Sequence, residues 1–493
     1  METKNLKQKA TAGLIWVALR NYASMGISFI SGIILARLLT PHDYGCIGLL
    51  SIFMALSNTF IDAGFGSALI QKKDPTNTDY STIFFWNMGV ALFLYIILFF
   101  AAPTVARFYK IPVLSPVLRV QALVIILYAF NLVQINQLRK QLKFKTLSLV
   151  TLCTSVIALA VTIVMAFHGL GVWSLVAQNL ISAFLPAIFY WFYVKWRPIK
   201  TFSWSSFRQL FSFGSYVLLS HFVNEFCRHI PGLLIGKLFS AATLGYYSKA
   251  AGTEKMASQA ISGVISNITF PLYSAAQDDK KILGNIIKRL TMSIAYITFP
   301  LMLILMLIAK PLFVLLYSER WLPSVIYFQV LCTIGIASCL QTINAQSIAA
   351  IGKSKQMFNW TLMKRGVGSS AIIIGLLTYG MKGFLVGVII FNYFSYAVNI
   401  GLVSKYIGYK WTSQLKDLLH ITIMSVAAFV VSLASTYFLH TDIYITGIIR
   451  LVVYLIVYIG WSLILKPEAF VYTINNIPAR FRFWEKRGKG KHS

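Results

Sequence analysis

We single out six charged side chains that lie within or beside the long apolar stretches of this sequence, where charge is rare. A charge in a membrane-spanning segment is costly and usually faces a water-filled cavity or a charged partner. We therefore expect a cationic, substrate-binding cavity, and the residues expected to line it are Arg20, Arg228 and Lys255. The acidic members of the set, which could exchange ions or form ion pairs, are Asp62, Glu225 and Glu254.

Arg20 lies midway along the first apolar stretch, and no acidic residue lies one helical turn away from it in the sequence. A phosphate-bearing ligand would give this guanidinium a partner that accepts two parallel hydrogen bonds. A backbone carbonyl or Glu225 is the alternative partner. The sequence leaves these possibilities open.

Glu225 and Arg228 are three residues apart, so they can meet on one helix face. Either they form an internal ion pair, or Arg228 faces the cavity and Glu225 modulates the electrostatics of Arg228. Glu254 and Lys255 are adjacent, and their side chains point roughly 100° apart on a helix. We expect one of these two to face the cavity and the other to pair with the helix that carries Glu225.

The rest of the chain consists of apolar stretches that position these charges. Hydrophobic residues make up 57% of the 493 residues and charged residues only 12%, about half the charged content of a soluble domain. About 20 apolar residues are needed to cross a bilayer as a helix. The sequence predicts about fourteen such helices: 12–36, 45–66, 81–103, 117–138, 147–167, 171–194, 209–237, 244–273, 289–309, 323–348, 359–379, 382–404, 416–439 and 443–465.

The net charge of +30 is distributed in short clusters between the apolar stretches. With the N-terminus in the cytoplasm, basic residues are roughly threefold more frequent in the cytoplasmic connections, as the positive-inside rule requires. Both termini are then cytoplasmic, and residues 471–493 form a basic cytoplasmic tail. No domain is left that could read nucleic acid.

Two stretches of the sequence indicate an internal duplication. The segment 31–45 resembles 231–245, with Gly32 matching Gly232 and Gly45 matching Gly245. Both segments join the first two helices of a six-helix block, so the blocks are parallel repeats related by an axis along the membrane normal. We predict an N-lobe over 1–200, a C-lobe over 201–405 and two additional helices over 406–470.

The sequence lacks the residue patterns that a metal site, a nucleotide-binding loop or an enzyme active site would need. The five cysteines and the histidines show no metal-ligand spacing, so neither a metal site nor a cofactor is expected. The sequence has no glycine-rich phosphate loop ending in Gly-Lys-Ser/Thr. No paired carboxylates lie on a large external loop, which argues against an enzyme such as a membrane-embedded polysaccharide polymerase.

Several motifs resemble those of a known family. The stretch GIILARLLTPHDYGCIGLL, then FIDAGFGSALIQKKD, INQLRKQLKFKTLSLV and GLGVWSLVAQNL, is similar to the polysaccharide-transporter family of Wzx-type lipid-linked oligosaccharide flippases, with the colanic-acid and teichuronic-acid exporters the nearest subgroup. The resemblance places the chain in the MOP exporter superfamily. It implies a MATE-like, all-α fold of two six-helix lobes with two extra helices.

The resemblance also implies an activity. The chain would flip an undecaprenyl-diphosphate-linked oligosaccharide, an O-antigen or exopolysaccharide unit, between leaflets of the bacterial cytoplasmic (inner) membrane. Its expected partners are this substrate, membrane lipids, and a polysaccharide polymerase and glycosyltransferases. A cation-coupled drug antiporter of the same fold and the polymerase are the alternatives.

Overall fold

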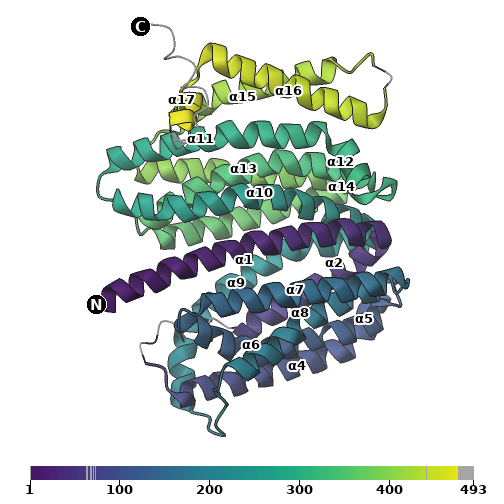
Figure 1. Ribbon diagram of the computed structural model, residues 1–493, viewed down its shortest axis with the longest axis vertical. Coiled ribbons are helices and arrows are strands. Elements are labelled where there is room, and N and C mark those ends of the chain that lie inside the picture. Colours follow the sequence, from purple (N-terminus) through teal and green to yellow (C-terminus); the bar gives the residue numbers. More distant parts are fainter. Residues whose placement is uncertain are drawn as a thin grey trace, which may run out of the picture. The chain divides into compact units, whose positions relative to one another are not determined.

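The computed structural model describes residues 2–62, 65–66, 69, 72, 74–439 and 441–475, and every regular element in these ranges is a helix (Figure 1). Contacts divide the chain into two compact units, residues 1–248 and 249–493. The lobe boundaries stay predictions, and the basic tail from residue 476 onward lies outside the described residues. The all-α class is confirmed.

The first unit consists of helices. They are α1 (Glu2–Leu38), α2 (Pro41–Asp62), α4 (Asn77–Tyr109), α5 (Leu114–Gln121), α6 (Leu123–Lys140), α7 (Phe144–Phe167), α8 (Val172–Tyr193) and α9 (Trp204–Leu238). Helix α10 (Ala241–Ala275) begins in this unit and continues into the second. Within the unit, α7 packs against α1 and α8, α4 packs against α6, and α2 packs against α9.

The second unit is also helical. Its elements are α11 (Lys280–Leu307), α12 (Ala309–Tyr317), a short 3-10 turn (Glu319–Trp321), α13 (Ser324–Ala350), α14 (Ser354–Tyr406), α15 (Trp411–Ala434), α16 (Ile443–Leu465) and α17 (Glu468–Asn475). Helix α13 packs against α11 and α14, and α15 packs against α11 and α16. Lys288 on α11 forms ion pairs with Asp417 of α15 (3.4 Å) and Glu468 of α17 (3.5 Å), so one cation joins three helices.

Eleven helices in the described residues are long and apolar enough to cross a membrane. The two predicted helices over 359–379 and 382–404 lie in α14, which is interrupted at Tyr379 and Gly380. Gly380 has φ 59° and ψ −140°, a conformation that side chains disfavour. The predicted helices 209–237 and 244–273 correspond to α9 and α10, which are not among the eleven. The count of fourteen therefore stays a prediction.

The duplicated segments have the same local structure. Helix α1 ends at Leu38 and α9 ends at Leu238, two hundred residues later. In the first turn, Asp43 N donates to Thr40 Oγ1 (3.3 Å), and in the second, Thr243 N donates to Ser240 Oγ (3.0 Å). Each hydroxyl thus caps the helix that follows. The symmetry of whole lobes stays a prediction.

The matched glycines bring the two capped helix starts into contact. A Cβ on Gly45 would overlap the carbonyl of Ala241, and a Cβ on Gly245 would overlap the carbonyl of Pro41. Each glycine therefore lies against the backbone at the start of the other helix. Small residues allow this close approach between membrane helices, where packing rather than the hydrophobic effect drives association.

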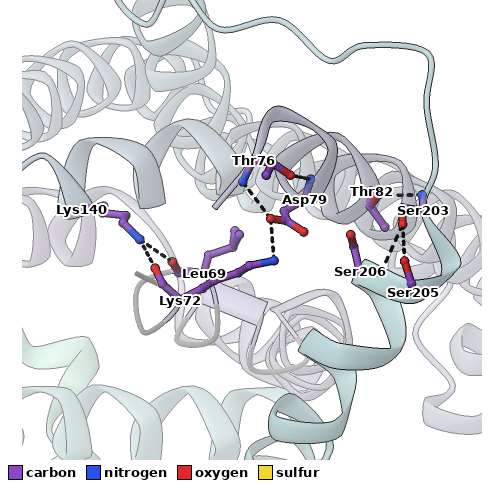
Figure 2. A network of polar contacts seen from close by, with 9 residues as sticks. All are labelled: Leu69, Lys72, Thr76, Asp79, Thr82, Lys140, Ser203, Ser205 and Ser206. Carbon is purple, nitrogen blue, oxygen red and sulfur yellow. Dashed lines mark hydrogen bonds and ion pairs between the residues drawn. The ribbon is translucent and has the colours of Figure 1, made fainter. Parts of the chain in front are cut away.

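A polar network fastens the start of α9 to the start of α4 (Figure 2). Asp79 caps α4 by accepting from Thr76 N (2.8 Å), and it also pairs with Lys72 (2.8 Å). Its carboxylate is only 1% exposed, so the pair is shielded from water. Ser203 N donates to Thr82 Oγ1 (3.0 Å), which ties the residue that caps α9 to the same helix.

The backbone of Lys72 is held in turn by the side chain of Lys140. Lys140 on α6 donates to the carbonyl oxygens of Leu69 (3.2 Å) and Lys72 (Figure 2). The connection that follows α2 is thereby joined to α6 as well as to α4.

Replacing Gly245 with leucine should weaken the crossing of α2 and α10. Overpacking of this kind costs about 1–3 kcal/mol, and thermal unfolding of the purified protein in detergent would measure the loss. Gly252 on the same helix is the matched control, because no atom lies within 4 Å of a Cβ built there. An equal loss of stability in both variants would contradict the close contact.

Asp79→Asn should destabilise the network by roughly 1–3 kcal/mol, because Lys72 loses a charge-assisted partner. Asp74→Asn, an exposed change in the same connection, should alter stability by less than about 0.5 kcal/mol. Protease protection of the α2–α4 connection in membrane vesicles offers an independent readout. Unchanged protection in Asp79→Asn would show that the pair does not hold the connection.

Candidate functional site

Two adjoining cavities lie within the first unit. One has a volume of about 350 Å³ and the other about 500 Å³, and both are lined by Ala55, Asn58 and Arg228. Arg228 therefore stands where the cavities meet. The walls come from α2, α9 and three further helices of the first unit, α5, α6 and α8.

Three polar residues of α9 lie on one helix face and line the smaller cavity. His221, Glu225 and Arg228 are separated by four and three residues, so they share one helix face, and all three line this cavity. On α2, Asn58 and Asp62 are four residues apart and line the same cavity from the other side. The cavity thus holds two carboxylates and one guanidinium.

An ion pair fixes the position of Arg228. Its Nη2 lies 2.6 Å from Glu225 Oε2, and His229 Nε2 lies 3.6 Å from the same oxygen. His229 Nδ1 is in turn 3.2 Å from Ser51 Oγ of α2. The spacing left open an ion pair or an Arg228 that faces the cavity; the two side chains are paired, and Arg228 also lines the cavity.

The ion pair leaves the guanidinium accessible. The Arg228 side chain is 53% exposed, whereas that of Glu225 is 22% exposed. A guanidinium has five N–H donors, and Glu225 engages one end of it. Arg228 can therefore accept an anionic ligand from the cavities while Glu225 holds it in place.

Besides Arg228 and His229, the larger cavity is lined by neutral polar groups and apolar surface. Its amides and hydroxyls come from three helices, α2, α5 and α8: Ser51, Asn58, Gln121, Asn179 and Ser182. Asn179 Nδ2 donates to Gln121 Oε1 at 3.4 Å, a long bond. Such groups can exchange their mutual hydrogen bonds for bonds to hydroxyls of a ligand.

The other predicted site residues are placed differently. Arg20 lines neither cavity, and its guanidinium bonds the side chain of the adjacent Asn21 (3.0 Å). Glu254 lies in the second unit, where it accepts from Ser258 Oγ, and Lys255 beside it is exposed. Their proposed roles stay predictions, and only Arg228, Glu225 and Asp62 are brought to one cavity.

Several cavity residues were not among the predicted site residues: Ser51, Gln121, Tyr128, Ser182, His221 and His229. Spacing alone could have found His221, since it shares a helix face with Glu225 and Arg228. The others needed the packing of α2 against α5, α6, α8 and α9, which no local pattern reveals.

The fold matches that of known transporters. The chain is similar to a lipid II flippase, MurJ, in an inward closed conformation, with a TM-score of 0.71 and 14% identity over 92% of this chain and 100% of that one. It is also similar to a multidrug resistance MATE family transporter of the MOP superfamily, with a TM-score of 0.62 and 14% identity over 80% of this chain and 98% of the other. The predicted MATE-like fold is confirmed.

The sequence matches a family and one of its curated relatives. The chain is 24% identical to the teichuronic acid biosynthesis protein TuaB of Bacillus subtilis (strain 168) over 445 residues, which cover 88% of this chain and 91% of the relative. The family model described as polysaccharide biosynthesis protein matches residues 34–326, more than half of the chain. The predicted resemblance is confirmed, and the chain belongs to the polysaccharide biosynthesis protein family.

Proposed function

We propose that this protein is a flippase that moves an undecaprenyl-diphosphate-linked oligosaccharide from the cytoplasmic to the periplasmic leaflet of the bacterial inner membrane by alternating access. The observation that carries the proposal is the half-exposed Arg228 at the junction of two polar cavities. Family membership and the flippase-like fold support it. Glycosyltransferases would supply the cargo, and a polymerase would consume it.

The two cavities suit the two polar parts of such a cargo. A diphosphate binds a guanidinium through paired, charge-assisted hydrogen bonds, and Arg228 provides that group. Sugar hydroxyls both donate and accept, as do the amides of Asn58, Gln121 and Asn179 in the larger cavity. The diphosphate and the sugar of the cargo would therefore be bound by neighbouring groups of the protein.

Helix α9 contains a residue that allows it to bend beside the site. Pro231 lies inside α9, three residues after Arg228. Proline lacks the N–H that would bond the carbonyl of Cys227, so the helix can kink there. A bend at this point would move Arg228 relative to α2, as alternating access requires.

A cation-coupled drug antiporter is the second candidate function. The smaller cavity holds the carboxylates of Asp62 and Glu225, and a cationic drug needs an acidic partner. With Glu225 paired to Arg228, Asp62 is the group that would bind the drug. This candidate has the same fold and differs from the first in the charge of its cargo.

Arg228→Ala should reduce flipping at least tenfold, because a hydrogen bond to a charged group contributes about 1.5–3 kcal/mol. Arg228→Lys should recover only part of the activity, since lysine cannot form the paired bonds. The measurement is the amount of lipid-linked oligosaccharide retained on the cytoplasmic leaflet, at equal protein levels in the membrane.

Lys237→Ala provides the control for this experiment, since Lys237 is a cation of the same helix that lines neither cavity. Normal flipping by Arg228→Ala would overturn the proposal. Efflux of a cationic dye that is abolished by Asp62→Asn and retained in Arg228→Ala would favour the antiporter instead.

The proposed orientation places both termini in the cytoplasm. Reporter fusions after Lys200 and after Lys405 should both report a cytoplasmic position, and a fusion after Lys110 should report the periplasm. The expectation rests on the excess of basic residues in alternate connections. A periplasmic signal at either of the first two positions would contradict the helix count.

A further inference from the structure

Helix α10 presents a polar stripe to α13 within the second unit. Glu254, Ser258 and Ser262 follow one another at intervals of four residues, so they lie on one face. Ser262 Oγ lies 3.6 Å from Cys339 Sγ of α13. A Cβ built on Gly335, also on α13, would lie close to Glu254 Oε1 and to Ser258 Oγ. The carboxylate is therefore directed at α13.

The surroundings of Glu254 supply one hydrogen bond, and Lys255 of the same helix is the cation that acts on its charge. Ser258 donates to Oε1, and Met302 of α11 contributes a thioether to the same space beside Gly335. The titratable groups of α13 that face the carboxylate are the thiols of Cys332 and Cys339.

No salt bridge reaches Glu254 from the residues that the structure describes. The neighbouring cation on its own helix, Lys255, is exposed. An uncompensated carboxylate is costly in apolar surroundings, and taking up a proton removes that cost.

The other two acidic candidates are already engaged. Glu225 is paired with Arg228. Asp62 accepts from Gly66 N (3.3 Å) and lines the smaller cavity. Of the three carboxylates predicted as coupling groups, Glu254 is thus the one whose charge lacks both an ion-pair partner and a place in these cavities.

The neighbours of Glu254 favour a proton over a metal cation. Hard cations bind through several oxygen ligands. Here the nearby groups are one hydroxyl, a thioether and two thiols. A proton needs only the carboxylate itself.

Helix α10 connects this carboxyl group to the rest of the protein. Its first turns pack on α2 through Gly245 in the first unit, and Glu254 packs on α13 farther along the same helix.

We propose that Glu254 is the group that takes up and releases a coupled proton during transport, and that its protonation controls how α10 packs on α13. The proposal rests on the flippase function proposed above. The carboxylate accepts one proton from water on one side of the membrane and returns it to water on the other, so that no other reactant is needed.

The first test detects the proton without any cargo. Infrared difference spectra of the protein in liposomes, recorded across a pH series, should contain a protonated-carboxyl band that disappears in Glu254→Gln. Glu225→Gln, which removes the ion-paired carboxylate, should retain the band. Ser258→Ala should move its titration to higher pH, because the charged form loses a hydrogen bond. A band that persists in Glu254→Gln would overturn the proposal.

The second test measures transport of a fluorescent undecaprenyl-diphosphate-linked disaccharide in proteoliposomes. A pH gradient should stimulate the wild-type protein, a sodium gradient should not, and Glu254→Gln should lose the stimulation while still exchanging the probe without a gradient. Stimulation by sodium alone, or unchanged stimulation by pH in Glu254→Gln, would overturn the proposal. If the wild-type protein does not move the probe, the flippase function fails, and the infrared band still decides whether Glu254 binds a proton.

Discussion

The cost of placing polar groups in a bilayer controls this structure. Backbone N–H and C=O groups have no water to bond in the hydrocarbon region, so the chain forms helices throughout the described residues. The same cost applies to each charged side chain, which needs an ion pair, a cavity or a proton. Glu225 illustrates the ion pair and Asp62 the cavity, and the proton is the solution that we propose for Glu254.

Helices in a membrane cannot rely on the hydrophobic effect to associate, and this chain uses close approach and polar capping instead. Gly45 and Gly245 admit the backbone of the opposing helix at the start of α2 and α10. Asp79 caps α4 and holds Lys72 beside it, while Thr82 fastens the residue that precedes α9. These contacts place α9 against α2 and α4, and the cavities lie along α9.

The proposed flippase function makes two demands on the candidate site. The site would have to hold a charged, sugar-bearing headgroup, and it would have to change shape to release it. Arg228 and the amides of the larger cavity suit the first requirement. Pro231 in α9 suits the second, because it allows a bend directly beyond the guanidinium. Within the second unit, the proposed proton on Glu254 would act on the packing of α10 against α13.

The sequence by itself determined the membrane class, the family and the positions of the long helices, because apolar length and glycine-rich turns are local properties. It also placed Glu225 and Arg228 on a shared helix face through their three-residue spacing, with an ion pair as one of two possible arrangements. Short elements such as α12 and α17 were missed, because eight or nine residues leave no spanning signal. Only the tertiary structure decided what each face meets: Glu254 of α10 faces Gly335 of α13. Helical periodicity fixes the direction of a side chain and carries no information about the helix opposite.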